Sequence, residues 1–440
     1  MYAVLAGLGL AAPALAQAPA LAQAPLSLDE ALERARTRNP AARGAASSER
    51  AAEHRVTQAK GGYWPRIDLV ESWQRGNQPV FVFSSLLSQK QFTAANFAID
   101  SLNNPNAVDN FRTAFMIEQP LFDGSTRANV AAARVGRDMA SAGRLVVDHE
   151  LGAGVTAAYA RVIVAVAARR SAEAAAASAG ADRELAGNRR DAGLVTDADV
   201  LQLDLHVSRS REQQIRAASD EQVARAQLNE LMSEPLDTVF TLDPSTSVAV
   251  IDTANVAALE AEALESRPDL KVAALQERLA DTAQKAARAA FLPQVSAQAG
   301  WEINGGTWGS RESSWVVGAT ARINLFQGFA DKARLAEARE LATGRALDTE
   351  RAIAAARLEV RTAVARLDAA RASDVVGRAA VAQAVESRRI IRDRYEAGLT
   401  DVTSLLRAAE AVVQAETQQV AAQAAVLTGT AALERAVGRR

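Results

Sequence analysis

The sequence predicts a mainly α-helical fold with a membrane β-barrel portion, in which a pair of strands followed by a long helical hairpin occurs twice. Three observations support this prediction. Long stretches rich in Ala, Arg and Glu contain few helix breakers. Four runs of about ten residues alternate between apolar and polar side chains, as tilted barrel strands do. Short landmarks recur in the same order in both halves, which indicates an internal duplication.

The duplication divides the chain into a first repeat at 23–232, a linker at 233–253 and a second repeat at 254–440. One insertion breaks the symmetry, because the segment from Trp73 to Phe111 is far longer than the one from Trp301 to Trp315. We interpret the extra segment as an enlarged loop. The recurring landmarks are Asn39-Pro40 and Arg267-Pro268, Tyr63-Trp64-Pro65 and Phe291-Leu292-Pro293, Leu121-Phe122-Asp123-Gly124 and Leu325-Phe326-Gln327-Gly328, and Ala192-Gly193-Leu194 and Ala397-Gly398-Leu399.

Six segments have the composition and apolar spacing of helices. A helix of about 60 residues is roughly 90 Å long, so the longest of them do not fold back into a compact globule. They must pair along their length as coiled coils. The predicted helices are Leu28–Lys60, Thr126–Arg189, Thr196–Met232, Ala254–Ala290, Asp331–Arg394 and Val402–Val437.

The four strands are predicted at about residues 63–73, 111–122, 293–303 and 314–326. In the first run Ile67, Leu69 and Trp73 alternate with polar residues, although Glu71 interrupts the apolar side. Apolar side chains facing lipid and polar side chains facing a lumen are typical of a water-filled barrel. A soluble, half-buried sheet alternates in the same way, so the pattern alone leaves both readings open.

Four strands are too few to close a membrane barrel, and an open edge in lipid leaves backbone groups unpaired. Other chains must therefore supply strands. Strand number alone allows a dimer with eight strands or a trimer with twelve. An eight-stranded barrel is filled by its own side chains. The polar residues of the inward positions favour a lumen, and so the larger barrel.

The composition excludes several classes of protein. There are 50 basic and 52 acidic residues, so the basic surplus that nucleic-acid binding needs is absent. The chain has no Cys, which excludes disulfides, thiolate metal sites and a cysteine nucleophile. Ala dominates the apolar residues, which favours close helix–helix contact over a thick globular core.

The N-terminus predicts a secretory signal peptide at residues 1–22. The first charged residue is Asp29, and both Ala14-Leu15-Ala16 and Ala20-Leu21-Ala22 fit a small-residue cleavage site. A basic start is missing, which leaves open whether Met1 is the true start. After the predicted signal peptide, no uncharged apolar run reaches the roughly 18–20 residues that a membrane-spanning helix needs. An exported chain of this kind is either soluble in the periplasm or a β-barrel.

Over its whole mature length the chain resembles the TolC-like outer-membrane efflux channels. The resemblance rests on the duplicated layout, the Pro-led strand starts at Pro65 and Pro293, the Leu-Phe-x-Gly turns and the Gly-Leu helix turns. It implies a homotrimer with a twelve-stranded barrel in outer-membrane lipid and a periplasmic helical tunnel. It also implies a passive exit duct of a tripartite efflux or type I secretion system, joined to a periplasmic adaptor and an inner-membrane pump.

The resemblance assigns roles to the two hairpin tips. Gly193, Leu194 and Val195 form the first tip, and Gly398, Leu399 and Thr400 form the second. In the family these tips close the tunnel and meet the adaptor. From the residues themselves, Gly accepts the positive φ of a tight helix–helix turn. Apolar Leu at exposed tips favours an added docking role over a purely structural one.

The resemblance also assigns the gate. A Tyr three residues before the second tip Gly and an Asp six residues after the first are joined in the family's closed gate, by bonds between neighbouring hairpins. Both match here, at Tyr395 and Asp199. The family's basic gate residue falls at Thr400, and its acidic aperture ring falls at Ser404 and Arg407. Cation preference at the aperture is therefore not expected.

No constellation of residues predicts an enzyme, a metal site or a cofactor site. The three His residues are scattered on predicted helices, and we expect all three on solvated faces. Asn304-Gly305-Gly306-Thr307 is expected to form a hairpin turn between strands. The alternatives are a periplasmic adaptor or a soluble coiled-coil scaffold. An adaptor would show one hairpin rather than two, and a scaffold would not need apolar strand faces.

Overall fold

The computed structural model describes residues 25–242 and 251–439. The predicted signal peptide and part of the predicted linker lie outside the described residues. The chain forms two compact units. Unit 1 contains the described residues up to Asn39 together with those of Gly152–Ile251 and Leu367–Ala431. Unit 2 contains Pro40–Leu151, Asp252–Arg366 and the residues after Ala431. The long helices α5 (Gly124–Asp191) and α9 (Ala330–Glu396) contribute to both units.

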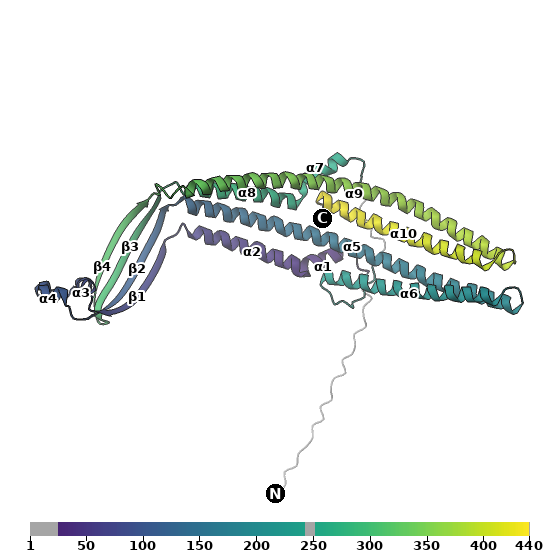
Figure 1. Ribbon diagram of the computed structural model, residues 1–440, viewed down its shortest axis with the longest axis horizontal. Coiled ribbons are helices and arrows are strands. Elements are labelled where there is room, and N and C mark those ends of the chain that lie inside the picture. Colours follow the sequence, from purple (N-terminus) through teal and green to yellow (C-terminus); the bar gives the residue numbers. More distant parts are fainter. Residues whose placement is uncertain (1–24, 243–250, 440) are drawn as a thin grey trace, which may run out of the picture. The chain divides into compact units, whose positions relative to one another are not determined.

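Unit 2 contains a four-stranded antiparallel sheet with the strand order β1-β2-β3-β4 (Figure 1). Every strand therefore pairs with its neighbour in sequence, and β2 and β3 join the two halves of the duplication. All four strands run further than predicted at the end of the sheet away from the long helices. The strands are β1 (Arg66–Gly76), β2 (Val108–Phe122), β3 (Gln294–Thr307) and β4 (Ser310–Arg322).

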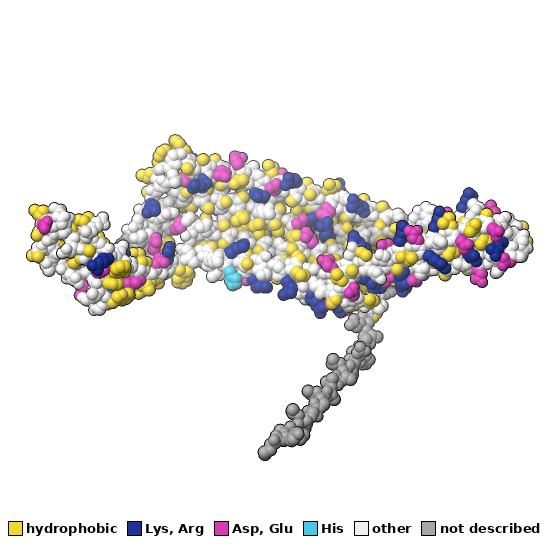
Figure 2. Space-filling model, turned by 60° about the horizontal axis from the view of Figure 1, so that its bottom comes forward, with side chains coloured by type: hydrophobic (Ala, Val, Ile, Leu, Met, Phe, Trp, Pro, Cys, Tyr) yellow, Lys and Arg dark blue, Asp and Glu magenta, His cyan; other side chains and the backbone are white. Residues whose placement is uncertain are grey.

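The strand register confirms the alternation of the sheet faces. Leu69 pairs with Phe115, Phe115 with Trp301, and Trp301 with Trp315, so these side chains share one face. Most large apolar side chains of this face are exposed within the chain, and Figure 2 shows hydrophobic side chains gathered over the strands. The opposite face carries polar side chains, including the ion pair between Arg112 and Glu302 at 2.7 Å. An apolar face this exposed needs lipid or protein to cover it.

The predicted hairpin turn at Asn304-Gly305-Gly306-Thr307 is wrong. These residues belong to β3, and the turn is the two-residue connection Trp308-Gly309, since Thr307 pairs with Ser310. The register shifts between Asn304 and Thr307, which marks a bulge. Glycine is needed at position 305 because the backbone of Ser310 lies close to it, and not because the chain turns there. A Cβ atom on Gly305 would lie 2.2 Å from the backbone oxygen of Ser310.

The enlarged loop between β1 and β2 is not an irregular loop. It folds into the short helices α3 (Pro79–Ser88) and α4 (Ile99–Asn103) with the 3₁₀ turn η1 (Ala94–Phe97) between them. We call residues 77–107 the insert. Edge-to-face contacts between Phe83 and Phe92 at 4.7 Å and between Phe92 and Phe97 at 5.1 Å hold its parts together.

Two predicted helices are each broken by proline. Leu28–Lys60 divides into α1 (Leu28–Arg38) and α2 (Pro40–Gly61), and Ala254–Ala290 divides into α7 (Val256–Ser266) and α8 (Pro268–Ala289). The residues between them, Asn39 and Arg267, are extended, with ψ of 131° and 120°. A residue before proline disfavours the helical conformation, so both breaks have the same cause.

The long hairpins follow the prediction closely. Beside α5 and α9, they consist of α6 (Asp197–Met232) and α10 (Val402–Val437). In unit 1 the hydroxyl group of Tyr159 on α5 donates a hydrogen bond of 2.8 Å to the backbone oxygen of Leu26, and α1 packs against α6. Within the described residues, α5 is long and apolar enough to meet a length and composition criterion for a membrane span, and 44% of that apolar window is buried. A buried Ala-rich helix of a soluble region meets the same criterion.

We expect Gly305→Ala to destabilise the sheet, because the added methyl group overlaps the backbone of Ser310. Overpacking of this kind costs about 1–3 kcal/mol. Thermal unfolding of detergent-solubilised protein, followed by circular dichroism, measures the effect. Gly309→Ala is the matched control, since a Cβ atom there has no neighbour within 4 Å. Equal melting temperatures for the two variants would contradict the prediction.

Candidate functional site

The two hairpin tips of unit 1 have the same local geometry. Gly193 and Gly398 both adopt a φ of +75°, the left-handed region that favours glycine. Each tip closes its first helix with a Schellman pair of bonds. The backbone N–H of Leu194 donates to the oxygen of Arg189 at 2.9 Å, and that of Gly193 donates to Arg190 at 2.8 Å. The equivalent donors of Leu399 and Gly398 bond to Arg394 and Tyr395 at 2.8 and 3.0 Å.

Leucine is the most exposed apolar residue at each tip. The exposed fraction is 65% for Leu194 and 77% for Leu399, whereas Val195 and Thr400 are half-buried. The turn geometry does not require leucine, because both turns are closed by backbone bonds. Two exposed leucines on matching turns therefore form an apolar surface available to a partner.

Behind the tips, a small core joins all four long helices. Tyr395 of α9 is 1% exposed and is the largest fully buried side chain among the described residues. It packs with Ala186 of α5, Val200 and Leu203 of α6, and Val402 and Leu405 of α10. The Tyr395 ring therefore fixes the distance between the two hairpins at their tips.

The hydroxyl oxygen of Tyr395 is buried and has no hydrogen-bond partner among the described residues. Burial raises the pKa of this hydroxyl; Arg189 opposes the shift, and Asp199 and Asp182 add to it. The hydroxyl therefore stays neutral and keeps its proton to donate. A buried polar group without a partner costs about 1–3 kcal/mol, so a partner is expected in some state of the protein.

Asp199 does not bond to Tyr395 within the described chain. Its carboxylate instead forms the capping box of α6, accepting from the backbone N–H of Thr196 at 2.9 Å and from the Thr196 hydroxyl at 2.8 Å. An ionised carboxylate offers about four lone-pair sites, so it retains capacity for another donor. The bond assigned to the family's closed gate is one between neighbouring hairpins, and it stays a prediction.

Sequence reasoning missed Arg189, four residues before Gly193. Its guanidinium group donates a hydrogen bond of 2.6 Å to the backbone oxygen of Glu396, the last residue of α9. The same group lies over the Tyr395 ring, 5.0 Å from its centroid. A cation at a helix C-terminus stabilises the exposed carbonyl groups there. Arg189 thus ties the first tip to the second within one chain.

Sequence reasoning also missed Asp182, whose carboxylate is buried between helices. It accepts a hydrogen bond of 2.9 Å from Arg388 and lies 3.6 Å from the guanidinium group of Arg392, both on α9. Its side chain is 2% exposed. No motif marks this residue, since pairing across helices far apart in sequence is decided by tertiary packing.

His206 corrects the expectation that every His lies on a solvated face. It is half-buried on α6, where burial lowers its pKa, and the charges of Glu410, Asp182 and Arg388 act on it more weakly. His149 on α5 is half-buried as well, whereas His54 is exposed, as expected. No group of three or more metal-ligating side chains occurs among the residues that the structure describes.

The predicted aperture residues lie on the first turns of α10. Ser404 is half-buried, and its backbone N–H donates to the carboxylate of Asp401 at 2.9 Å. Arg407 is exposed. The role of both residues at an aperture stays a prediction.

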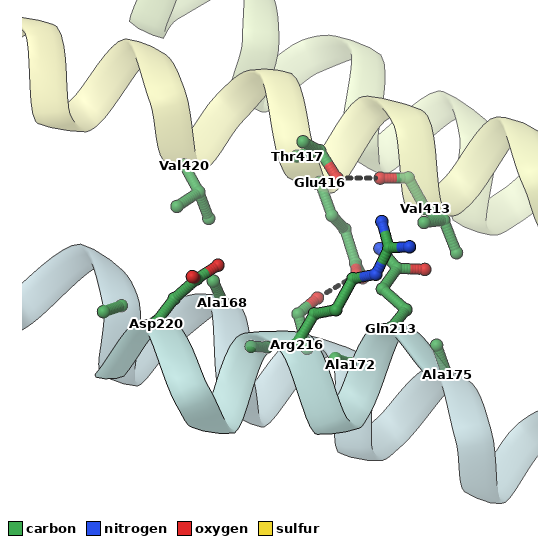
Figure 3. Close-up of a pocket in the computed structure, with 13 residues that line it drawn as sticks. Ala168, Ala172, Ala175, Gln213, Arg216, Asp220, Val413, Glu416, Thr417 and Val420 are labelled. Carbon is green, nitrogen blue, oxygen red and sulfur yellow. Dashed lines mark hydrogen bonds between the residues drawn. The ribbon is translucent and has the colours of Figure 1, made fainter. Parts of the chain in front are cut away.

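A cavity of about 300 Å³ lies further along the hairpins, between α5, α6 and α10 (Figure 3). Ala168, Ala172 and Ala175 line one side of the cavity. The cavity exists because their methyl groups are too small to fill the space between the helices. The hydroxyl group of Ser171 donates across the cavity to the carboxylate of Glu416. This cavity is a packing gap bridged by one hydrogen bond and brings together no reactive groups.

Comparison with known proteins identifies the family. The family model described as outer membrane efflux protein matches residues 31–234 and 259–439, which is most of the chain. The chain belongs to the outer membrane efflux protein family. The two matched segments correspond to the two halves of the duplication. No curated protein matches the chain.

Solved structures with the same fold include outer membrane proteins of several bacteria. VceC from Vibrio cholerae is 19% identical, with a TM-score of 0.79 over 93% of this chain and 96% of that one. CmeC from Campylobacter jejuni is 16% identical, with a TM-score of 0.78 over 93% and 85%. MtrE from Neisseria gonorrhoeae, solved in its open state, is 19% identical, with a TM-score of 0.77 over 93% and 88%. These identities support the fold.

As a member of this family, the protein is an efflux channel of the outer membrane with a periplasmic helical extension. The prediction of family, fold class and location is confirmed. Nothing supports the alternative of a periplasmic adaptor or scaffold. Efflux channels of this family generally form trimers and work with adaptors and inner-membrane pumps. The family is one of channels rather than enzymes.

We expect Asp182→Ala to loosen the hairpins near the tips, because it removes the carboxylate that pairs with Arg388, while Arg392 keeps its ion pair with Glu396 at 3.3 Å. Breaking a buried ion pair costs about 3–5 kcal/mol, and the partial exposure of both Arg residues favours the low end. Limited proteolysis of the tip helices measures the loosening. Asp204→Ala is the control, because its pair with Arg183 is half-exposed and such pairs contribute about 0–1 kcal/mol. Equal cleavage rates would refute the expectation.

Proposed function

We propose that three copies of this chain form a twelve-stranded barrel continued by a helical tunnel, and that the assembly conducts substrate passively to the cell exterior. The sheet supports this proposal. Strands β1 and β4 each pair on one side only within the described chain, and one sheet face is apolar and exposed. Neither an open edge nor an unsatisfied backbone is stable in lipid, so the edges must pair with other copies.

The tips are the proposed gate. The observation that carries this part is the buried Tyr395 hydroxyl, which lacks a partner within the described chain although it sits at the point where both hairpins meet. We infer that the closed assembly supplies the partner through Asp199, whose carboxylate keeps free lone pairs. A hydrogen bond to a charged acceptor contributes about 1.5–3 kcal/mol, little enough for a docking protein to break.

The exposed tip leucines are the proposed adaptor contact. A periplasmic adaptor with an apolar hairpin end would cover Leu194 and Leu399, with Val195 and Thr400 at the margin. Covering a leucine side chain contributes about 1.5–3 kcal/mol, so the two residues of each chain together supply enough energy to offset the loss of the gate bond. The inner-membrane pump and the adaptor then select the substrate. The duct itself carries the exposed Arg407 and the hydroxyl group of Ser404 at its aperture.

Single-channel recording of the purified protein in planar bilayers tests the gate. We expect Tyr395→Phe to raise the resting conductance, because the variant keeps the tip core and removes the donor. Tyr159→Phe is the matched control, since it also removes a buried hydroxyl from unit 1 but lies far from the tips in sequence and structure. If Tyr395→Phe conducts like wild type, the hydroxyl does not hold the gate.

We expect the double substitution Leu194→Ser and Leu399→Ser to abolish adaptor cross-linking and efflux in cells. The expected cause is lost apolar contact, so the resting conductance of the purified channel should not change. Leu236→Ser, at an exposed leucine after α6, is the control and should leave cross-linking intact. Normal cross-linking by the double variant would exclude the tip leucines from docking.

A further inference from the structure

The insert of residues 77–107 lies against the polar face of the sheet. Helix α3 contacts β2, β3 and β4. Val82 and Ser85 of α3 and the following Gln89 are each 5% exposed or less, so this side of the insert is covered. The opposite, apolar face of the sheet must meet lipid, which leaves the polar face as the one turned toward the lumen.

Gln89 is the main polar anchor of the insert. Its amide nitrogen donates to the backbone oxygen of Asp109 at 2.9 Å and to the side-chain oxygen of Asn110 at 3.0 Å. The Asn110 amide donates in turn to the side chain of Asn304 at 3.1 Å. All three side chains are at most 8% exposed. A buried chain of amide hydrogen bonds fixes one position, because breaking it leaves several polar groups unpaired.

The next residue, Lys90, provides a second contact between the insert and the sheet. Lys90 takes a positive φ of 54°, which turns the chain after α3, and its ammonium group lies 2.9 Å from the carboxylate of Glu312 on β4. Glu312 pairs with Asn304, and Asn304 pairs with Arg112, so the side chains that anchor the insert lie on the face of the Arg112–Glu302 ion pair. The insert is therefore bound across three strands on the lumen side.

The insert also stands at one end of the lumen. The pair Gly76 and Val108 ends the β1–β2 ladder, and Thr307 and Ser310 end the β3–β4 ladder. At this end β3 and β4 are joined by only two residues, whereas the insert joins β1 and β2 (Figure 1). The other end of the sheet continues into the helices. In an outer-membrane channel with a periplasmic extension, the insert thus lies at the extracellular mouth.

We propose that the insert is a second constriction of the duct, which narrows its extracellular mouth and limits the size of what passes. Its uncovered surface is apolar: Val80 and Ile99 are 75% and 77% exposed, and Leu87 and Phe97 are also exposed. Three inserts, one from each copy, would surround the exit with these side chains. The passage suits slender or amphipathic substrates better than strongly hydrated, bulky ones. This inference rests on the proposed barrel and on its lumen face, and it is independent of the tip gate.

The test uses access from outside intact cells, which does not depend on the tips. Because the chain has no Cys, Gln298→Cys places a single thiol on the lumen face of β3. Cells are treated with a small maleimide or with a maleimide that carries a bulky polyethylene glycol chain. We expect the small reagent to label at the same rate with or without the insert. We expect the bulky reagent to label several-fold faster when residues 77–107 are replaced by a two-residue Asn-Gly turn.

Three further variants serve as controls for misfolding of the shortened chain. The pair Gln89→Leu and Lys90→Glu keeps the insert but removes both anchors, and we expect it to speed bulky labelling as well. Gln91→Leu, at an exposed neighbour, should not. A thiol at Gly309→Cys, in the short turn outside the lumen, should react equally in every background. Heat-modifiable migration on a denaturing gel establishes that each variant is assembled.

The outcomes separate this inference from the proposed function. If the bulky maleimide labels Gln298→Cys equally fast in the intact, shortened and unanchored proteins, the insert does not constrict the mouth. This result would not contradict the proposed channel function. If even the small maleimide fails to reach Gln298→Cys in all of them while Gly309→Cys reacts, the polar face is not a lumen open to the exterior. The proposed barrel would then fail together with the inference.

Discussion

An open four-stranded sheet in lipid is the constraint on which the rest of this structure depends. Each unpaired backbone group in a bilayer costs several kcal/mol, so β1 and β4 have no stable state unless other copies pair with them. On the apolar face, Leu69, Phe115 and Trp301 stay exposed among the residues that the structure describes. In the proposed trimer, assembly and membrane insertion are therefore linked, and the polar face lines the lumen.

In the proposed channel, the hairpin tips and the insert control the duct. Both depend on amide, hydroxyl or carboxylate groups placed between helices and strands. At the tips, Tyr395 fills the core that joins the hairpins, and Arg189 ties the end of α9 to α5. At the mouth, Gln89 and Asn110 fix the insert to the sheet. A buried polar hydrogen bond fixes the positions of its partners but contributes only a modest net free energy. Such a bond suits contacts that form in one state of the protein and break in another.

Much of the fold follows from local sequence. Long Ala-rich stretches without breakers make helices, Pro40 and Pro268 end the helices before them, and alternation of apolar and polar residues makes strands. Gly193 and Gly398 identify the tips because a positive φ is required there. The predicted hairpin turn was wrong because the glycines that suggested it are explained by a contact between strands. Asn304-Gly305-Gly306 resembles a turn, yet the glycine is needed because the backbone of Ser310 lies against it.

The sequence by itself determined the duplicated layout, the helices, the strand faces, the family and the positions of the tip residues. All of these depend on neighbours close along the chain or on recurring order. Only the tertiary structure decided which residues far apart meet. It brought Asp182 to Arg388, placed Arg189 over Tyr395, left Asp199 in its capping box, and laid the insert on the polar face of the sheet. Contacts of this kind are set by how helices and strands pack, and no local pattern of residues encodes them.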